Sequence, residues 1–187
     1  VSTTLEADVV FADKVLTTAQ DIADYCMDDV ADGAQKTGYY ALGNDITTTT
    51  YGTNTSMGLS NAGFAGTFNG CGHTVTLNNL TGAGLFNIVN GGTITNTKFV
   101  ATITSYSWKS HILAHKINSM TLTNCEFEYS ITAKGTIDGI AGVIAGNQGG
   151  GPSTIKNCSF TNTGEMAADL LFGYANDKYA LTSLLKL

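Results

Sequence analysis

One seven-residue pattern occurs three times in this chain, as TITNTKF at 93–99, TLTNCEF at 121–127 and TIKNCSF at 154–160. Each copy reads threonine, aliphatic, polar, asparagine, small, polar, phenylalanine, and successive copies begin 28 and 33 residues apart. Sequence periods of roughly 20 to 50 residues are typical of solenoids, in which each structural unit stacks on the next. The pattern therefore predicts a repeat protein.

Short strands build each repeat. After the phenylalanines, apolar residues alternate with polar ones at a period of two, which is typical of a strand with one buried face. The side chains that we expect to face the core are Phe99, Ala101, Ile103, Phe127, Tyr129 and Ile131. Pairs of mainly apolar residues at 85–86, 113–114, 144–145 and 171–172 form a second series at a similar period. Both series favour an all-β solenoid of parallel coils.

The repeated asparagine gains a role if the coils stack. Asn96, Asn124 and Asn157 would then lie one above another at a coil corner, about 4.8 Å apart. Their amides can hydrogen-bond along the stack, as asparagine ladders do in other stacked β structures. Asparagine also tolerates the left-handed backbone of a sharp corner. The alternative is that these asparagines only form turns. Their recurrence in one register of the repeat favours the ladder.

The first 38 residues differ from the rest. Nine of the 15 acidic residues precede position 46. A short strand is expected at 9–16, followed by an amphipathic helix at 17–31 with Thr18 as N-cap and Asp21 in a capping box. The acidic helix would cap the open end of the solenoid, although docking to a neighbouring domain is the alternative. Residues 39–187 would hold the coils and a C-terminal end cap, with a second helical pattern at 164–171.

Three stretches resemble a known family. They are TTAQDI at 17–22, GYYALGNDI at 38–46 and FAGTFNGCGHTV at 64–75. With the repeated corners, they are similar to the right-handed parallel β-helix domains of large secreted or wall-attached bacterial proteins, including the GLUG-repeat type. The resemblance extends from about Thr17 to Gly173. It implies a right-handed parallel β-helix and the role of an adhesin, a spacer or a carbohydrate-associated module. Asn69 stands where the family usually has Asp, a mild change at a turn.

Composition narrows the function classes. Charged residues make up 13% of the chain against the usual share of about 25%. The net charge is −6, and all nine basic residues are lysines, which disfavours nucleic-acid binding. No stretch approaches the roughly 20 apolar residues of a membrane span, so membrane insertion is not expected. We interpret the chain as a mature product or an excised domain of an extracellular or cell-surface protein.

Catalytic and metal chemistry find little support in the sequence. His73 lies in a glycine-rich turn, where packing or a hydrogen bond explains it. On a strand, His111 and His115 would lie about 13 Å apart, too far for a shared ion. Glu126 and Glu128 have a spacing that suits a glycosidase, about 6.5 to 7 Å, but no neighbouring coil adds an acid in register. We expect Glu126 to form a weak surface ion pair with Lys98. We expect no enzyme activity and no bound metal or cofactor.

The cysteines suggest a stacked pair. Cys125 and Cys158 occupy equivalent repeat positions, and the spacing of about 4.8 Å lies within the Cα window of a disulfide. Parallel side chains in register often fail the disulfide torsion, however. We expect free, buried and inert thiols.

A loop carries the candidate ligand contacts. Tyr106, Trp108, Lys109 and His111 place the one Trp of the chain beside polar groups, a combination that stacks on sugars or anchors protein partners. Trp108 folding back over the core is the alternative.

The sequence favours an extracellular module for adhesion, display or binding of a glycan or protein on a surface, or of neighbouring domains of a larger chain. A polysaccharide lyase or hydrolase, or its accessory carbohydrate-binding module, is the alternative.

Overall fold

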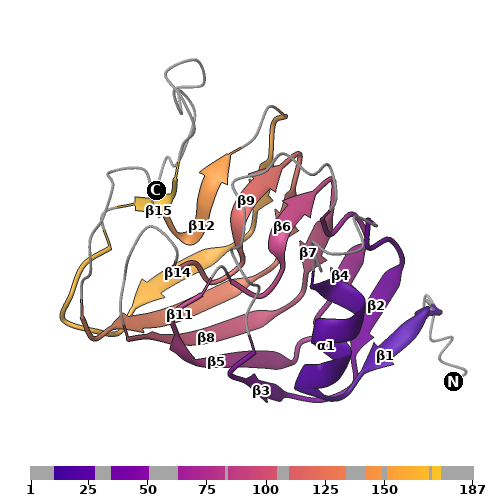
Figure 1. Ribbon diagram of the computed structural model, residues 1–187, viewed down its shortest axis with the longest axis horizontal. Helices are drawn as coiled ribbons and strands as arrows, with labels where there is room; N and C mark the ends of the chain where they lie inside the picture. Colours follow the sequence, from indigo (N-terminus) through magenta and orange to yellow (C-terminus); the bar gives the residue numbers. More distant parts are fainter. Residues whose placement is uncertain are drawn as a thin grey trace, which may run out of the picture.

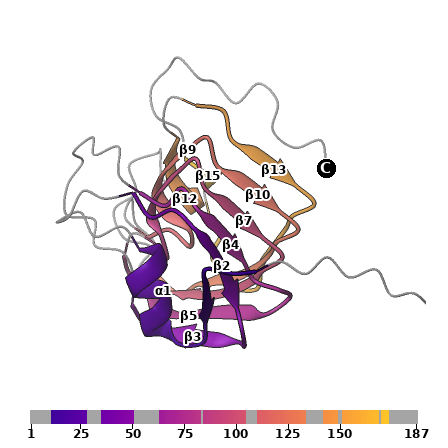
Figure 2. The ribbon, with the colours of Figure 1, turned by 90° about the vertical axis from the view of Figure 1, so that its right-hand side faces the viewer.

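The computed structural model describes residues 11–27, 35–50, 63–82, 84–104, 110–133, 142–148, 151–168 and 170–173. Across these residues the chain winds through about four turns of a parallel β-solenoid with three faces (Figure 1; Figure 2). The first face is a six-stranded sheet with, in spatial order, β1 (Lys14–Leu16), β2 (Tyr39–Leu42), β4 (Thr67–Asn69), β7 (Thr93–Thr95), β10 (Thr121–Thr123) and β13 (Thr154–Lys156). The expected parallel β-helix is confirmed.

Two further sheets complete each coil. The second face holds β3 (Ile46–Thr48), β5 (Thr74–Leu80), β8 (Lys98–Ile103), β11 (Glu126–Ile131) and β14 (Ser159–Asn162). The third face holds β6 (Asn87–Asn90), β9 (Ala114–Asn118), β12 (Gly142–Gln148) and β15 (Leu170–Phe172). Every pairing between these strands is parallel, so each strand bonds to its counterpart one coil away.

The core is made of side-chain stacks that run along the solenoid. Leu122 pairs with Ile94 on one side and with Ile155 on the other, as the repeat predicts. The ring centroids of Phe99 and Phe127 lie 4.9 Å apart, at an angle of 15°. Phe160 continues this stack at 5.2 Å from Phe127. Ile155 and Phe160 are only half-buried, because β13 and β14 are the last strands of their sheets.

One helix, α1 (Ala19–Cys26), covers the N-terminal end of the described coils, where it contacts β1 and β3. The predicted capping box is present, since the Thr18 hydroxyl accepts from the Asp21 amide at 3.1 Å and the Asp21 carboxylate accepts from the Thr18 amide at 3.0 Å. Ile22 and Cys26 are buried. The helix ends at Cys26, because the backbone of Met27 is extended, so it is shorter than the expected 17–31.

A second helix at 164–171 is not formed, and that prediction was wrong. Residues 164–166 form a bend, and Leu170–Phe172 is strand β15, in which Phe172 pairs with Ala145 of β12. The series of apolar pairs explains the outcome. Hydrogen bonding to the preceding coil satisfies the backbone there, and this tertiary contact outweighs a weak local helical pattern.

The stack of Ile94, Leu122 and Ile155 allows a direct test of the core. Leu122→Ala is expected to lower the free energy of unfolding by about 2 to 5 kcal/mol, because a fully buried side chain leaves a cavity between two neighbouring coils. Urea denaturation followed by circular dichroism measures the loss. Leu122→Ile, which copies the residue of the adjacent coils, is the matched control and is expected to cost less than about 1.5 kcal/mol. Equal stability of the Ala variant and the wild type would contradict the stacked core.

Candidate functional site

The corner between the first and second sheets has the same construction in three coils. Two residues connect the strands, and the first is an asparagine with left-handed backbone. The φ values are 51° at Asn96, 53° at Asn124 and 53° at Asn157. The next residue, Thr97 in the first of these coils, donates its hydroxyl to the Thr95 carbonyl oxygen at 2.8 Å. The corner therefore has a local hydrogen bond as well as the left-handed conformation that Asn tolerates.

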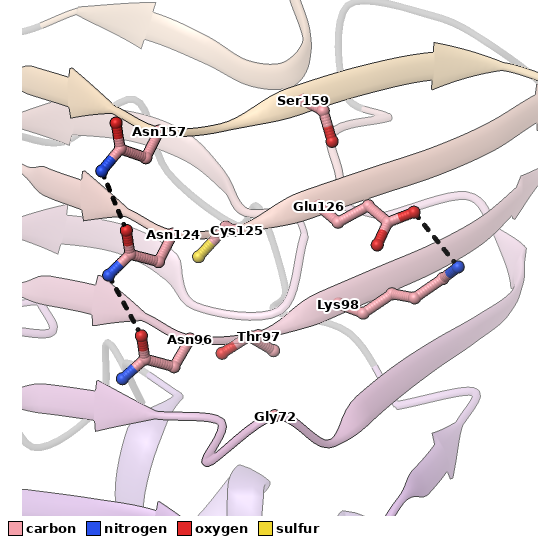
Figure 3. A pocket seen from close by; sticks show the side chains of 9 residues that line it. All are labelled: Gly72, Asn96, Thr97, Lys98, Asn124, Cys125, Glu126, Asn157 and Ser159. Carbon is pink, nitrogen blue, oxygen red and sulfur yellow. Dashed lines mark hydrogen bonds and ion pairs between the residues drawn. The ribbon is translucent and has the colours of Figure 1, made fainter.

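An amide ladder joins these corners, as Figure 3 shows. Asn157 Nδ2 donates to Asn124 Oδ1, and Asn124 Nδ2 donates to Asn96 Oδ1, both at 3.2 Å. The ladder continues beyond the predicted rungs. Asn96 donates to Asn69 Oδ1 at 3.2 Å, and Asn69 donates to the Tyr39 hydroxyl at 2.6 Å. Four coils are thus tied together by side-chain amides at one edge.

A shallow groove of about 490 Å³ runs along this edge (Figure 3). The ladder amides form one side, and the first residues of β8, β11 and β14 form the other. The lining residues are Gly72, Asn96, Thr97, Lys98, Asn124, Cys125, Glu126, Asn157 and Ser159. Amide, hydroxyl, carboxylate and ammonium groups therefore face one shared space, which suits a ligand rich in hydrogen-bonding groups.

Lys98 organises the charge beside the groove. Its Nζ lies 3.3 Å from Glu126 Oε1, the expected partner, and 2.7 Å from Glu128 Oε1, a closer second partner. The hydrogen bond from Lys98 holds the pKa of Glu128 below its usual range, and the same bond raises the pKa of Lys98. Both glutamates thus share one cation, and its contact with Glu128 favours the ionised form of that carboxyl group.

The cysteines at this corner are free, as predicted. Cys125 is buried, but Cys158 is only partly buried, because it belongs to the last of the described coils. A hydrogen bond from the Cys125 thiol lowers the pKa of Cys158 to about 7, so the predicted inertness does not hold for Cys158.

Of the four predicted ligand contacts, only His111 lies among the described residues. Tyr106, Trp108 and Lys109 lie outside the described residues, so their ligand-binding role stays a prediction. His111 is fully buried, and its Nδ1 donates to the Gly142 carbonyl oxygen at 2.6 Å, so its ring is not on the surface where ligand contact was expected. The His111 and His115 rings lie 5.5 Å apart, much closer than the predicted separation, because His111 precedes β9 rather than lying on it.

One histidine and one carboxylate form a pair at the same corner of the preceding coils. His73 Nδ1 donates to Asp45 Oδ1 at 3.2 Å, which is the hydrogen bond expected for a corner histidine. The Thr74 amide donates to the same oxygen at 2.9 Å and is the main reason that the pKa of Asp45 is lowered. Within the described ranges, no group of three or more His, Cys, Asp or Glu side chains could hold a metal ion.

A second amide ladder was not predicted from the sequence. Asn118 Nδ2 donates to Asn90 Oδ1 at 2.8 Å, and the Gly151 amide donates to Asn118 Oδ1 at 2.6 Å. This ladder lies at the corner between the third and first sheets. A signal was present, because each Asn precedes the first threonine of a repeat copy by three residues.

Comparisons with known proteins do not assign the chain to a family. No protein-family model, no curated protein and no solved structure matches the chain. The class that the structure itself defines is therefore the β-solenoid, a fold found among both enzymes and non-enzymes. In the part of the chain that is described, no helix has the length and apolar character required to cross a bilayer.

The ladder can be tested at its central rung. Asn124→Ala is expected to lower the free energy of unfolding by about 1 to 3 kcal/mol, because alanine resists left-handed backbone and two amide bonds are lost. Asn124→Gly keeps the backbone freedom and removes only the amide, so its loss is expected to be smaller. Chemical denaturation of both variants separates the two causes. A glycine variant less stable than the alanine variant would contradict the account of the corner.

The charge cluster predicts a pH effect with a definite sign. In the folded chain the pKa of Glu128 lies below its unfolded value of about 4.3, so the pair stabilises the fold above that pH. The contribution is lost as the pH falls through the folded pKa. Carboxyl titration by NMR is expected to show the pKa of Glu128 rising toward the ordinary value in Lys98→Met. Lys156→Met is the control and leaves it unchanged.

Proposed function

We propose that this chain is an extracellular binding module that holds a glycan along the asparagine groove. The observation that carries the proposal is the ladder of amides facing the same space as Lys98 and Glu126. An asparagine amide has two N–H donors and an oxygen with two lone pairs. Each inner rung uses one donor and one lone pair in the ladder itself, which leaves further capacity for ligand hydroxyls.

Rigidity supports the proposal. The amides are fixed by their left-handed corners and by each other, so little side-chain freedom is lost when a ligand binds. Successive rungs repeat at the strand spacing of about 4.8 Å. A regular row of donors and acceptors suits an extended ligand with regularly spaced hydroxyls, and the charged pair beside it would set orientation.

The carboxylates favour binding over hydrolysis. A glycosidase needs one carboxylic acid with a raised pKa beside a second carboxylate. Lys98 contacts both Glu126 and Glu128, and the pKa of Glu128 is moved in the opposite direction. The alternative, a polysaccharide lyase or hydrolase or its accessory module, needs an active pair elsewhere on the chain.

The wider setting of the module follows from the same features. A neutral polar surface on a repeat scaffold suits adhesion or display within a larger bacterial surface protein of the β-helix type that the sequence resembles. Protein on a surface, or a neighbouring domain of the same chain, is the other class of partner. A weakly charged solenoid fits the role of a rigid carrier for such contacts.

A binding experiment decides between the groove and the predicted loop. The purified chain is screened against a panel of neutral and acidic polysaccharides, and the best ligand is titrated by calorimetry. Asn124→Gly combined with Glu126→Gln is expected to weaken binding at least about tenfold, or 1.4 kcal/mol. Thr102→Ala, on the same sheet but outside the groove lining, is the control and is expected to bind like the wild type.

Two results would contradict the proposal. Absence of binding to every polysaccharide of the panel would remove the glycan. Loss of binding in Trp108→Ala with full binding in the groove variant would move the site to the loop. Chromatography of the incubated polysaccharides tests the enzymatic alternative, for which shorter products are the expected sign.

A further inference from the structure

Two cysteines of neighbouring coils occupy the same position at the asparagine corner. Thr123 pairs with Lys156 on one side of the corner and Glu126 pairs with Ser159 on the other, so Cys125 lies opposite Cys158. The Ser159 amide donates to the Cys125 carbonyl oxygen at 3.1 Å and fixes this register. Paired parallel strands lie about 4.8 Å apart, within the Cα separation of about 4.4 to 6.8 Å that a disulfide spans.

The two cysteines differ in exposure. Cys125 is 3% exposed, enclosed between the coils of Thr97 and Cys158. Cys158 is partly exposed, since β13 and β14 end their sheets. A reagent from solvent therefore reaches Cys158 more easily than Cys125, which gives the pair an outer and an inner sulfur.

The two thiols also differ in acidity. The hydrogen bond between them lowers the pKa of Cys158 to about 7 and raises the pKa of Cys125. An ordinary thiol has a pKa of about 8.5. A substantial share of Cys158 is thus thiolate at neutral pH, and the thiolate is the form that attacks disulfides.

We propose that Cys158 and Cys125 form a thiol–disulfide exchange site for small-molecule disulfides. The Cys158 thiolate attacks one sulfur of the disulfide, forms a mixed disulfide and releases one thiolate, which takes up a proton. Cys125 then loses its proton and attacks the sulfur of Cys158, which releases the second thiolate. The products are a Cys125–Cys158 disulfide and two small thiols, so the protein is oxidised by two electrons and the reagent is reduced. This inference does not depend on the proposed function.

The other two cysteines supply internal controls. Cys26 is fully buried, and burial raises its pKa, so it is not expected to react in the folded chain. Cys71 is exposed and would form an adduct of its own. Cys71→Gly removes that thiol and suits the φ of 52° at this position. All variants are therefore made in the Cys71→Gly background.

Threonine is the matched replacement at the pair. Thr97 occupies the equivalent position one coil earlier and donates its hydroxyl to the Thr95 carbonyl oxygen, and the Cys125 sulfur lies 3.3 Å from the corresponding Thr123 carbonyl oxygen. Cys125→Thr and Cys158→Thr are therefore expected to fold. Circular dichroism and the melting temperature of each reduced variant establish this before oxidation.

The experiment treats each reduced protein with oxidised glutathione at neutral pH and follows intact mass and peptide maps. The background protein is expected to lose two hydrogens, with peptides containing Cys125 and Cys158 cross-linked. Cys125→Thr is expected to stop at a glutathione adduct on Cys158, because the resolving thiol is missing. Cys158→Thr is expected to stay at its reduced mass, because Cys125 is covered.

Three results would overturn the proposal. They are a background protein that stays reduced, one that keeps a stable glutathione adduct on Cys158, and a Cys158→Thr variant that reacts at Cys125 as fast as the background protein does. A further readout separates exchange from simple exposure. The adduct rate of Cys125→Thr against pH is expected to show a midpoint nearer that of an ordinary thiol, since the threonine hydroxyl is expected to donate to the Thr123 carbonyl oxygen, as Thr97 does to Thr95, and not to Cys158.

Discussion

The structure depends on a two-residue corner that starts with asparagine in left-handed backbone. Side chains on a strand alternate between the two faces, so each corner has to return the chain with Phe99, Phe127 and Phe160 on the core face. The same corner length precedes β8, β11 and β14, and the phenylalanine stack follows from it. The amide ladder then holds successive corners in line. Local conformation and stacking thereby specify a single register together.

Much of this architecture could be predicted from the sequence. The repeat fixed which residues share a register, and alternation after Phe99 and Phe127 identified the buried face. The N-cap of α1 could be predicted because Thr18 and Asp21 interact locally. Features that depend on contacts between coils could not be predicted from the sequence. Strand β15 forms where the local pattern resembles a helix, and a bend before β9 brings His111 to His115.

The candidate site shows the same division. That Lys98 would meet Glu126 followed from register alone, whereas the shorter contact with Glu128 requires a long side chain reaching diagonally across the sheet. Stacking of Cys125 on Cys158 was likewise predictable. Their unequal exposure was not, because it arises from the position of the last coil and not from the repeat itself. Identical motif positions thus acquire different chemistry at the end of a stack.

The corners of each coil differ in how much chain they contain. Two residues separate β7 from β8 and β10 from β11, but ten separate β8 from β9 and ten separate β11 from β12. The short corner carries the ladder in the coils of β7, β10 and β13, whereas four residues, 70–73, form the same corner between β4 and β5. At its described end before β9 the long connection belongs to the coil, because the buried Leu113 donates its amide to the Ile144 carbonyl oxygen at 2.8 Å. Insertions and deletions should therefore accumulate away from this end, and a foreign peptide epitope grafted within 105–109 is expected to leave the scaffold unchanged.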